Sequence, residues 1–141
     1  MLEEMCTFKD LPLWVSERLS VVMKDFGGVA YDDYELYLES LAIDDCNPEN
    51  NKGSAVFLTT EEIIKVDFTL DSITIEKRRL SNLVKVSKKI FAPMEDAFKD
   101  QDLIWQLVDL VFLGGDNISL TLPVNNPTNN LHAYEKLISK F

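Results

Sequence analysis

The sequence has few of the residues that most often carry chemistry. Its 141 residues include 2 cysteines and 1 histidine. Cys6 and Cys46 do not form a C-x-x-C pair, and a structural zinc site needs about four nitrogen or sulfur ligands. We therefore expect neither a disulfide scaffold nor a metal centre, and we expect two reduced thiols in a cytoplasmic protein.

Catalytic and nucleotide-binding motifs are missing as well. Gly27-Gly28 and Gly114-Gly115 are isolated pairs, without the surroundings of a P-loop or of a dinucleotide-binding fingerprint. The chain has no G-x-S-x-G nucleophile elbow. His132 falls in an expected helix, where a lone histidine is usually a surface or capping residue. We expect a protein that is not an enzyme and that uses no cofactor.

Neighbouring carboxylates occur at positions 32–33, 44–45 and 61–62. General acid–base catalysis needs two carboxyl groups that lie close in space and in different environments. Adjacent acids in turns are better explained as solvated turn residues. The segment 44–49 could hold a hard cation loosely, but it lacks the ligand spacing and central glycine of an EF-hand loop.

Long hydrophobic runs are also absent. The run Leu110–Leu113 is far shorter than the roughly 20 apolar residues of a membrane-spanning helix. Residues 1–5 are acidic where a signal peptide needs a basic segment. We expect a cytoplasmic protein without stable membrane insertion, and the frequent Asn, Lys and Ile suggest a bacterial source.

Negative charge dominates what is present. The chain has 24 acids and 14 bases, a net charge of −10. Residues 1–52 hold 12 of the acids and 4 of the bases. An acidic field repels phosphate backbones at long range, so no nucleic-acid partner is expected.

A helix is predicted over residues 10–26. Asp10 can cap it, and Gly27-Gly28 can end it because glycine adopts the left-handed conformation at a helix C-terminus. One face of this segment is apolar at helical spacing. The residues of that face are Leu11, Val15, Leu19, Val22 and Phe26.

Residues 31–43 fit two interpretations. Tyr34, Leu38 and Leu41 have helical spacing, whereas alternation from Glu35 onward fits a strand. We favour the strand because a series of hairpins follows. Residues 44–53 are rich in turn-forming types and are expected to form a loop.

The rest of the chain alternates between short strands and tight turns, which is typical of an antiparallel meander. The turn Gly114–Asn117 favours a hairpin because its residues tolerate positive φ. Residues 92–101 are expected to connect two strands, and an amphipathic helix is predicted over 128–141. The expected strands are Ala55–Leu58, Ile63–Leu70, Ile73–Glu76, a strand from Leu80 to Phe91, Leu103–Leu113 and Ile118–Leu122.

This order of elements resembles the pleckstrin-homology (PH)-like superfold, and in style small bacterial PH-like domains of uncharacterised function. The resemblance covers residues 35–141, leaves 1–30 as an N-terminal helical extension, and predicts one α+β domain over 1–141: a bent antiparallel barrel of about seven strands closed by the C-terminal helix. It implies a binding scaffold. The segments that carry it are Ser54–Leu58, Glu62–Leu70, Ser72–Glu76, Asp116–Leu122 and Leu131–Phe141.

Residues 77–89 contain six bases and no acid, inside an acidic chain. The resemblance implies that phosphoinositide-binding members carry basic residues around the first hairpin loop, but here residues 44–53 hold three acids against one base. A non-catalytic protein-interaction module with an unknown protein partner, possibly itself, is therefore the favoured function. The alternative is a binder of a small anion or lipid headgroup through 77–89, where the candidate residues are Lys77, Arg78, Arg79 and Lys85. The basic stretch could also simply protect an edge strand or face the acidic N-terminal third.

Overall fold

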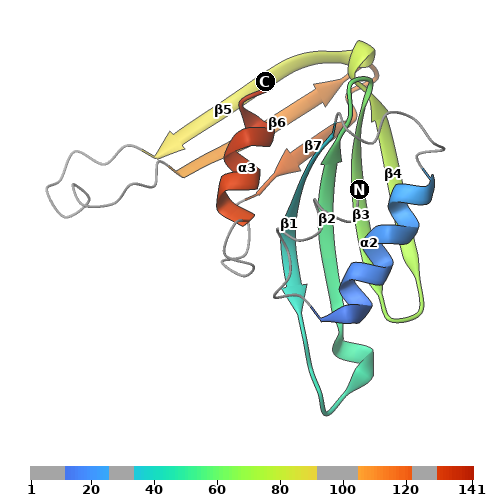
Figure 1. The fold of residues 1–141 in the computed structure, drawn as a ribbon. Coiled ribbons are helices and arrows are strands. Elements are labelled where there is room, and N and C mark those ends of the chain that lie inside the picture. Colours follow the sequence, from blue (N-terminus) through green and yellow to red (C-terminus); the bar gives the residue numbers. More distant parts are fainter. Residues whose placement is uncertain (1–11, 26–33, 92–104, 122–129) are drawn as a thin grey trace, which may run out of the picture. The chain divides into compact units, whose positions relative to one another are not determined.

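The computed structural model describes residues 12–25, 34–91, 105–121 and 130–141. Within them the fold is α+β, with an N-terminal helix, a C-terminal helix and seven antiparallel strands in two sheets (Figure 1). The chain divides into two compact units, Met1–Ser81 with Pro123–Phe141 and Asn82–Leu122, and each is described by itself. The single domain expected from the sequence stays a prediction.

The first unit contains a four-stranded sheet in the order β1-β2-β3-β4. All neighbouring strands are antiparallel. Its strands are β1 (Glu35–Ala42), β2 (Lys52–Leu58), β3 (Glu62–Thr69) and β4 (Ile73–Arg79), and its helices are α2 (Leu13–Asp25) and α3 (Asn130–Ile138).

Helix α2 confirms the helix predicted from the apolar stripe. Val15, Leu19 and Val22 are fully buried and belong to one core cluster with apolar residues of the sheet. The carbonyl oxygen of Pro12 accepts hydrogen bonds from the backbone N–H groups of Val15 and Ser16, which starts the first turn. The proposed cap at position 10 and the glycine stop at 27–28 lie outside the described residues.

Strand β1 decides between the two interpretations of residues 31–43 in favour of a strand. It pairs with β2 along its length, with a register shift between Leu38 and Ser40. Leu36 and Leu38 belong to the core cluster that includes α2. Tyr37 projects to the opposite face, because successive side chains of a strand alternate between faces.

The loop predicted over residues 44–53 is too long at its C-terminal end, because β2 already begins at Lys52. Gly53 is paired with both Leu41 and Phe68. A Cβ atom at position 53 would lie 2.6 Å from the Phe68 ring. Here glycine lets an aromatic ring lie against the backbone of a strand, and it does not mark a turn.

The fourth strand is longer than its apolar residues suggested. Strand β4 continues to Arg79, and the 3-10 turn η3 (Leu80–Asn82) follows it. The backbone N–H of Leu80 donates to the carbonyl oxygen of Glu61 over 2.8 Å, which extends the pairing with β3 by one step. The strand predicted to start at Leu80 therefore starts three residues later, at Leu83.

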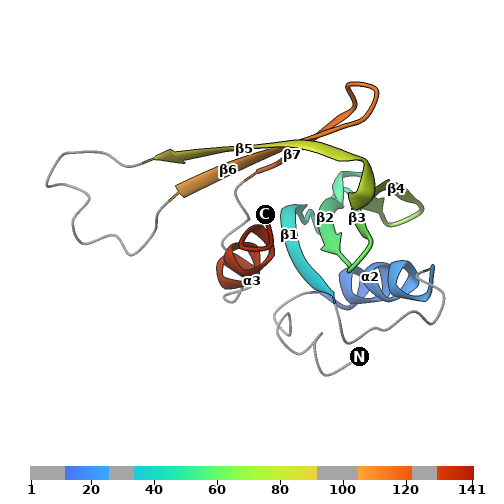
Figure 2. The same cartoon turned by 90° about the horizontal axis from the view of Figure 1, so that it is seen from above.

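Helix α3 packs on β1, as seen from above in Figure 2. It confirms the predicted C-terminal helix over its described part, and Tyr134, Leu137 and Ile138 are buried. The side-chain amide of Asn130 accepts a hydrogen bond from the N–H of Leu38 and donates one to its C=O, both over 2.7 Å. One buried side chain thus satisfies two backbone groups of an edge strand, which would be costly to leave unpaired.

The second unit contains a three-stranded antiparallel sheet in the order β5-β6-β7. Gly114 and Gly115 have positive φ angles of 91° and 83°, as predicted for the hairpin between β6 and β7. The connection predicted over 92–101 lies outside the described residues. The strands are β5 (Leu83–Phe91), β6 (Trp105–Phe112) and β7 (Asn117–Leu120).

Candidate functional site

The basic stretch 77–89 is divided between two strands. Lys77, Arg78 and Arg79 end β4, whereas Lys85, Lys88 and Lys89 lie in β5. The two strands belong to different units, and η3 connects them in the sequence. The stretch that is continuous in sequence is therefore shared by two strands of different units.

The three cations of β4 do not share a face. Arg79 lies opposite Glu62 and Lys77 opposite Ile64, on the sheet face that packs against α2, while Arg78 lies opposite Ile63 on the other face. The guanidinium of Arg78 lies 3.9 Å from the carboxylate of Glu76 and donates to the carbonyl oxygen of Lys77. The strand geometry does not gather these three side chains around a common anion.

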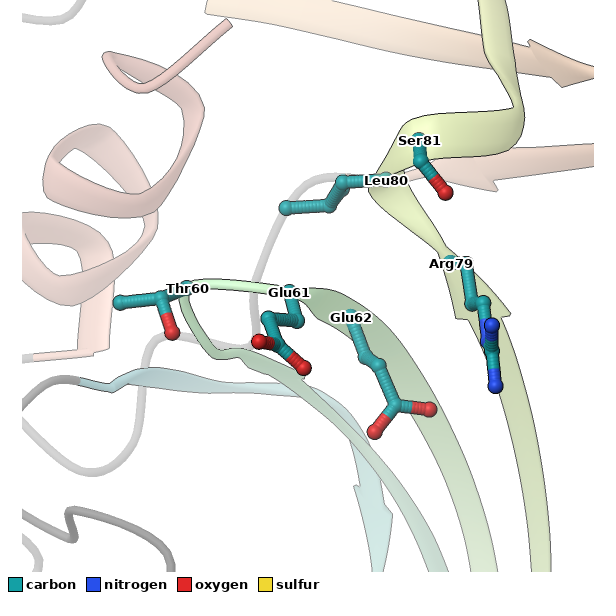
Figure 3. A pocket seen from close by; sticks show the side chains of 6 residues that line it. All are labelled: Thr60, Glu61, Glu62, Arg79, Leu80 and Ser81. Carbon is teal, nitrogen blue, oxygen red and sulfur yellow. The ribbon is translucent and has the colours of Figure 1, made fainter.

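Arg79 instead lines a concavity of about 500 Å³ at the end of the sheet (Figure 3). Its walls are the turn before β3 and the end of β4 with the start of η3. It contains no histidine, no cysteine and no buried carboxylate, which are the groups that acid–base or nucleophilic catalysis most often uses. The lining residues are Thr60, Glu61, Glu62, Arg79, Leu80 and Ser81.

Strand β5 is largely exposed, and, like β4, it has no buried residue among those whose exposure the structure describes. Val86 and Lys88 lie opposite Leu110 and Val108 of β6. Leu110 and Val108 are fully buried, yet Val86 is 37% exposed and Lys88 is also exposed. Neighbouring residues on this face of the sheet therefore differ, because those of β6 are buried and those of β5 are exposed.

The other face of β5 is exposed too. Lys85 and Lys89 project there, opposite Val111 and Leu107. Val84 lies in a register shift and is 59% exposed, and Ile90, on the same face as Val86 and Lys88, is 54% exposed. We call the six exposed residues of this strand the β5 surface: Val84, Lys85, Val86, Lys88, Lys89 and Ile90.

Only part of the β5 surface could be inferred from sequence. The charge of Lys85 makes it a candidate residue, and the structure places it on this surface. Val84, Val86 and Ile90 were assigned to a strand without any role. The available signal was three lysines interleaved with branched apolar residues, a pattern that protects edge strands in many sheets.

The acidic segment at 44–50 forms a hydrogen-bonded loop. Asp44 Oδ1 accepts from the N–H groups of Cys46 and Asn47, and its Oδ2 accepts from the side chain of Asn50. These bonds, that of Asn50 first, lower the pKa of Asp44 below its usual value. Its carboxylate already serves as the acceptor that organises this turn, which accounts for an aspartate here without a metal ion.

A buried polar cluster lies between β1 and α3. The rings of Tyr37 and Tyr134 meet edge to face with centroids 4.8 Å apart. Glu39 is nearly buried, and its carboxylate lies 3.4 Å from the ammonium group of Lys65. Burial, with the nearby Glu39 charge, raises the pKa of Tyr37 well above its usual range and that of Tyr134 to about 12. Sequence gave no sign of this cluster, because its members come from three separate elements.

The two other residues considered for chemistry, His132 and Cys46, are both exposed. His132 lies on the exposed side of α3 and Cys46 is an exposed free thiol. Among the residues that the structure describes, no group of three or more His, Cys, Asp or Glu side chains could hold a metal ion. No helix in the described ranges is long and apolar enough to cross a membrane.

Comparison with known proteins adds no assignment. No protein-family model, curated protein or solved structure matches the chain. Function must therefore be argued from the residues themselves.

Proposed function

We propose that this protein is a non-catalytic protein-interaction module and that it docks its partner on the β5 surface. The observation that carries the proposal is the exposure of Val84, Val86 and Ile90 on one edge strand. Single exposed apolar residues are ordinary, but a group of them rimmed by charges is a feature of interaction sites. A partner that covered them would gain about 25 cal/mol for each Å² of apolar surface removed from water.

The PH-like resemblance supports the same class of function. The resemblance leads one to expect about seven antiparallel strands followed by one C-terminal helix, and the described residues contain seven strands and then such a helix. Scaffolds of this kind usually hold a ligand or a protein, although fold-level analogy is a weak guide to function. We place the module in the cytoplasm, where the exposed thiol of Cys46 would stay reduced.

Binding of a small anion or lipid headgroup through 77–89 is the second candidate. The six bases of that stretch favour it, whereas the alternation of Lys77, Arg78 and Arg79 between two faces does not. If this candidate holds, the protein will bind vesicles that contain anionic lipids at low salt, and Arg78→Glu/Arg79→Glu will abolish binding. Wild-type protein that ignores such vesicles at low salt rules it out.

The experiment for the interaction module compares complexes in extracts of cells that express the protein. Val86→Asp/Ile90→Asp places two charges on the β5 surface, while the control Val21→Asp changes a valine of α2 that is 49% exposed. We expect wild type and control to elute in a larger complex and the double variant to elute as the free chain. Identical elution of all three proteins contradicts the proposal.

A further inference from the structure

Ser81 has a basic flank that no other serine or threonine of this chain has. Lys77, Arg78 and Arg79 lie 4, 3 and 2 residues before it, and Leu80 separates them from it. Every other serine and threonine has at most one base at those three positions. Protein kinases select substrates by charge patterns of this kind, through carboxylates that pair with cations near the accepting hydroxyl group. The flank therefore marks Ser81 as a candidate for modification.

The fold leaves this segment open to the groove of another protein. Strand β4 is the last strand of its sheet, and among the described strands it pairs only with β3. Ser81 lies just past that strand, in η3, and it is exposed, as are Lys77 and Arg79. Figure 3 shows Ser81 next to Leu80 at the rim of the concavity that Arg79 lines. Ser81 and the strand before it are thus accessible from solvent.

The alternation of the three cations suits recognition along an extended chain. Lys77 and Arg79 project to one face of the sheet and Arg78 to the other. That arrangement does not surround one small anion, but a groove with carboxylates on both walls can pair with cations on both sides of an extended segment. The guanidinium of Arg78 lies 3.9 Å from the carboxylate of Glu76 in a partly exposed pair. Because such a pair contributes little, Arg78 can exchange this carboxylate for one of a kinase.

From the flank, the exposure and the edge position together, we infer that Ser81 is phosphorylated by a protein kinase whose substrate groove is acidic. The hydroxyl oxygen of Ser81 bonds to the γ-phosphorus of ATP, the bond from that phosphorus to the β–γ bridging oxygen breaks, and ADP leaves. The hydroxyl proton passes to a carboxylate base of the kinase. The inference goes beyond docking on the β5 surface and does not depend on it.

Phosphorylation would reverse the local charge. Three cations end β4, and the concavity beside them holds the carboxylates of Glu61 and Glu62. A phosphoserine adds about two negative charges near neutral pH. Its phosphate can pair with Arg79, which lines the same concavity as Ser81, and the two glutamates repel it. This end of the sheet would change from weakly cationic to anionic and would no longer attract the anions of the second candidate function.

The test adds the purified full chain, with ATP labelled in its γ-phosphate, to an extract of the cells that express it. Circular dichroism verifies that each variant is folded, and peptide mass spectrometry locates the phosphoryl group. Ser81→Ala removes the acceptor. Arg78→Gln/Arg79→Gln removes the charge of the flank, whereas Arg78→Lys/Arg79→Lys keeps it. The control Lys24→Gln/Lys140→Gln removes equal charge at two exposed positions elsewhere.

We expect one phosphoryl group on Ser81 of wild type and control, and none on Ser81→Ala. The glutamine variant should be labelled at least about tenfold more slowly, because it loses two charge-assisted contacts to the kinase. The lysine variant should be labelled at an intermediate rate. Lysine keeps the charge but lacks the planar guanidinium group that binds a carboxylate through two hydrogen bonds.

The inference is overturned if wild type takes up no label, if the label lies on another residue, or if the glutamine variant is labelled as fast as wild type. None of these outcomes bears on docking at β5. The elution of Val86→Asp/Ile90→Asp decides that proposal separately.

Discussion

Strands β2 and β5 are similar in sequence character and opposite in environment. Both contain branched and aromatic apolar residues with lysine. In β2, six of the seven residues are buried, because it lies between β1 and β3 and Phe57 packs into the core beneath α2. In β5, Val84, Val86 and Ile90 remain exposed. The difference shows that an apolar strand is a core element only where neighbouring elements cover it, and that its side chains otherwise stay exposed.

The largest expected effect breaks the covered strand. Phe57→Ala should destabilise the protein by about 3–5 kcal/mol, because it removes a fully buried ring and leaves a cavity. Val86→Ala on β5 should change stability by less than about 0.5 kcal/mol. Urea denaturation of both variants measures the contrast, and equal losses would show that β5 is as much part of the core as β2.

The next effect concerns the edge of β1. Asn130→Ala removes both hydrogen bonds to Leu38 and leaves a buried N–H and C=O without that partner, which should cost about 2–4 kcal/mol. Asn117→Ala, at an exposed position of β7, serves as the control. If thermal unfolding shows the two variants to be equally stable, the Asn130 amide does not secure the edge.

A smaller effect should appear at alkaline pH. The unfolded chain ionises its tyrosines near pH 10, whereas burial raises the pKa of Tyr134 to about 12 and that of Tyr37 well above its usual value. The stability that they contribute is therefore fully present below pH 10 and is lost as the pH rises through about 12. Tyr37→Phe should flatten the fall in unfolding free energy above pH 10, measured by urea titration. An unchanged slope would mean that Tyr37 is accessible to water.

The smallest effect concerns the acidic loop. The lowered pKa of Asp44 means that its contribution to stability is present above pH 3.8 and is lost as the pH falls through the folded-state value. Asp44→Asn should therefore be less stable than wild type near pH 6, and the difference should shrink as the pH falls below 3.8. Melting curves across this range measure the difference, and a gap that stays constant as the pH falls would assign it to something other than the carboxylate.

Sequence patterns predicted the elements better than the surfaces. The stripe of Val15, Leu19 and Val22 predicted α2, and the glycines at 114–115 predicted a hairpin with positive φ, because each pattern depends on local geometry alone. The predicted end of the 44–53 loop was wrong because Gly53 is a strand residue. It is glycine because the ring of Phe68, a neighbour across the sheet, leaves no room for a Cβ atom. Local spacing holds no information about such a contact.

The sequence predicted one residue of the candidate site but not its apolar residues. Charge alone drew attention to Lys85, but the exposure of Val84 and Val86 depends on what covers β5, which no local pattern reports. The side chain of Asn130 binds the backbone of Leu38, 92 positions away in the sequence. Side chains that satisfy distant backbone groups are invisible to spacing rules.

The most direct test of the central claim is photo-crosslinking from single positions inside cells that express the protein. A photoreactive residue at position 86 on β5 is compared with one at position 21 on α2, since both positions hold exposed valines. The account predicts one discrete crosslinked product from position 86 and none from position 21. Equal products from both positions, or a product from position 21 alone, would contradict a docking role for β5.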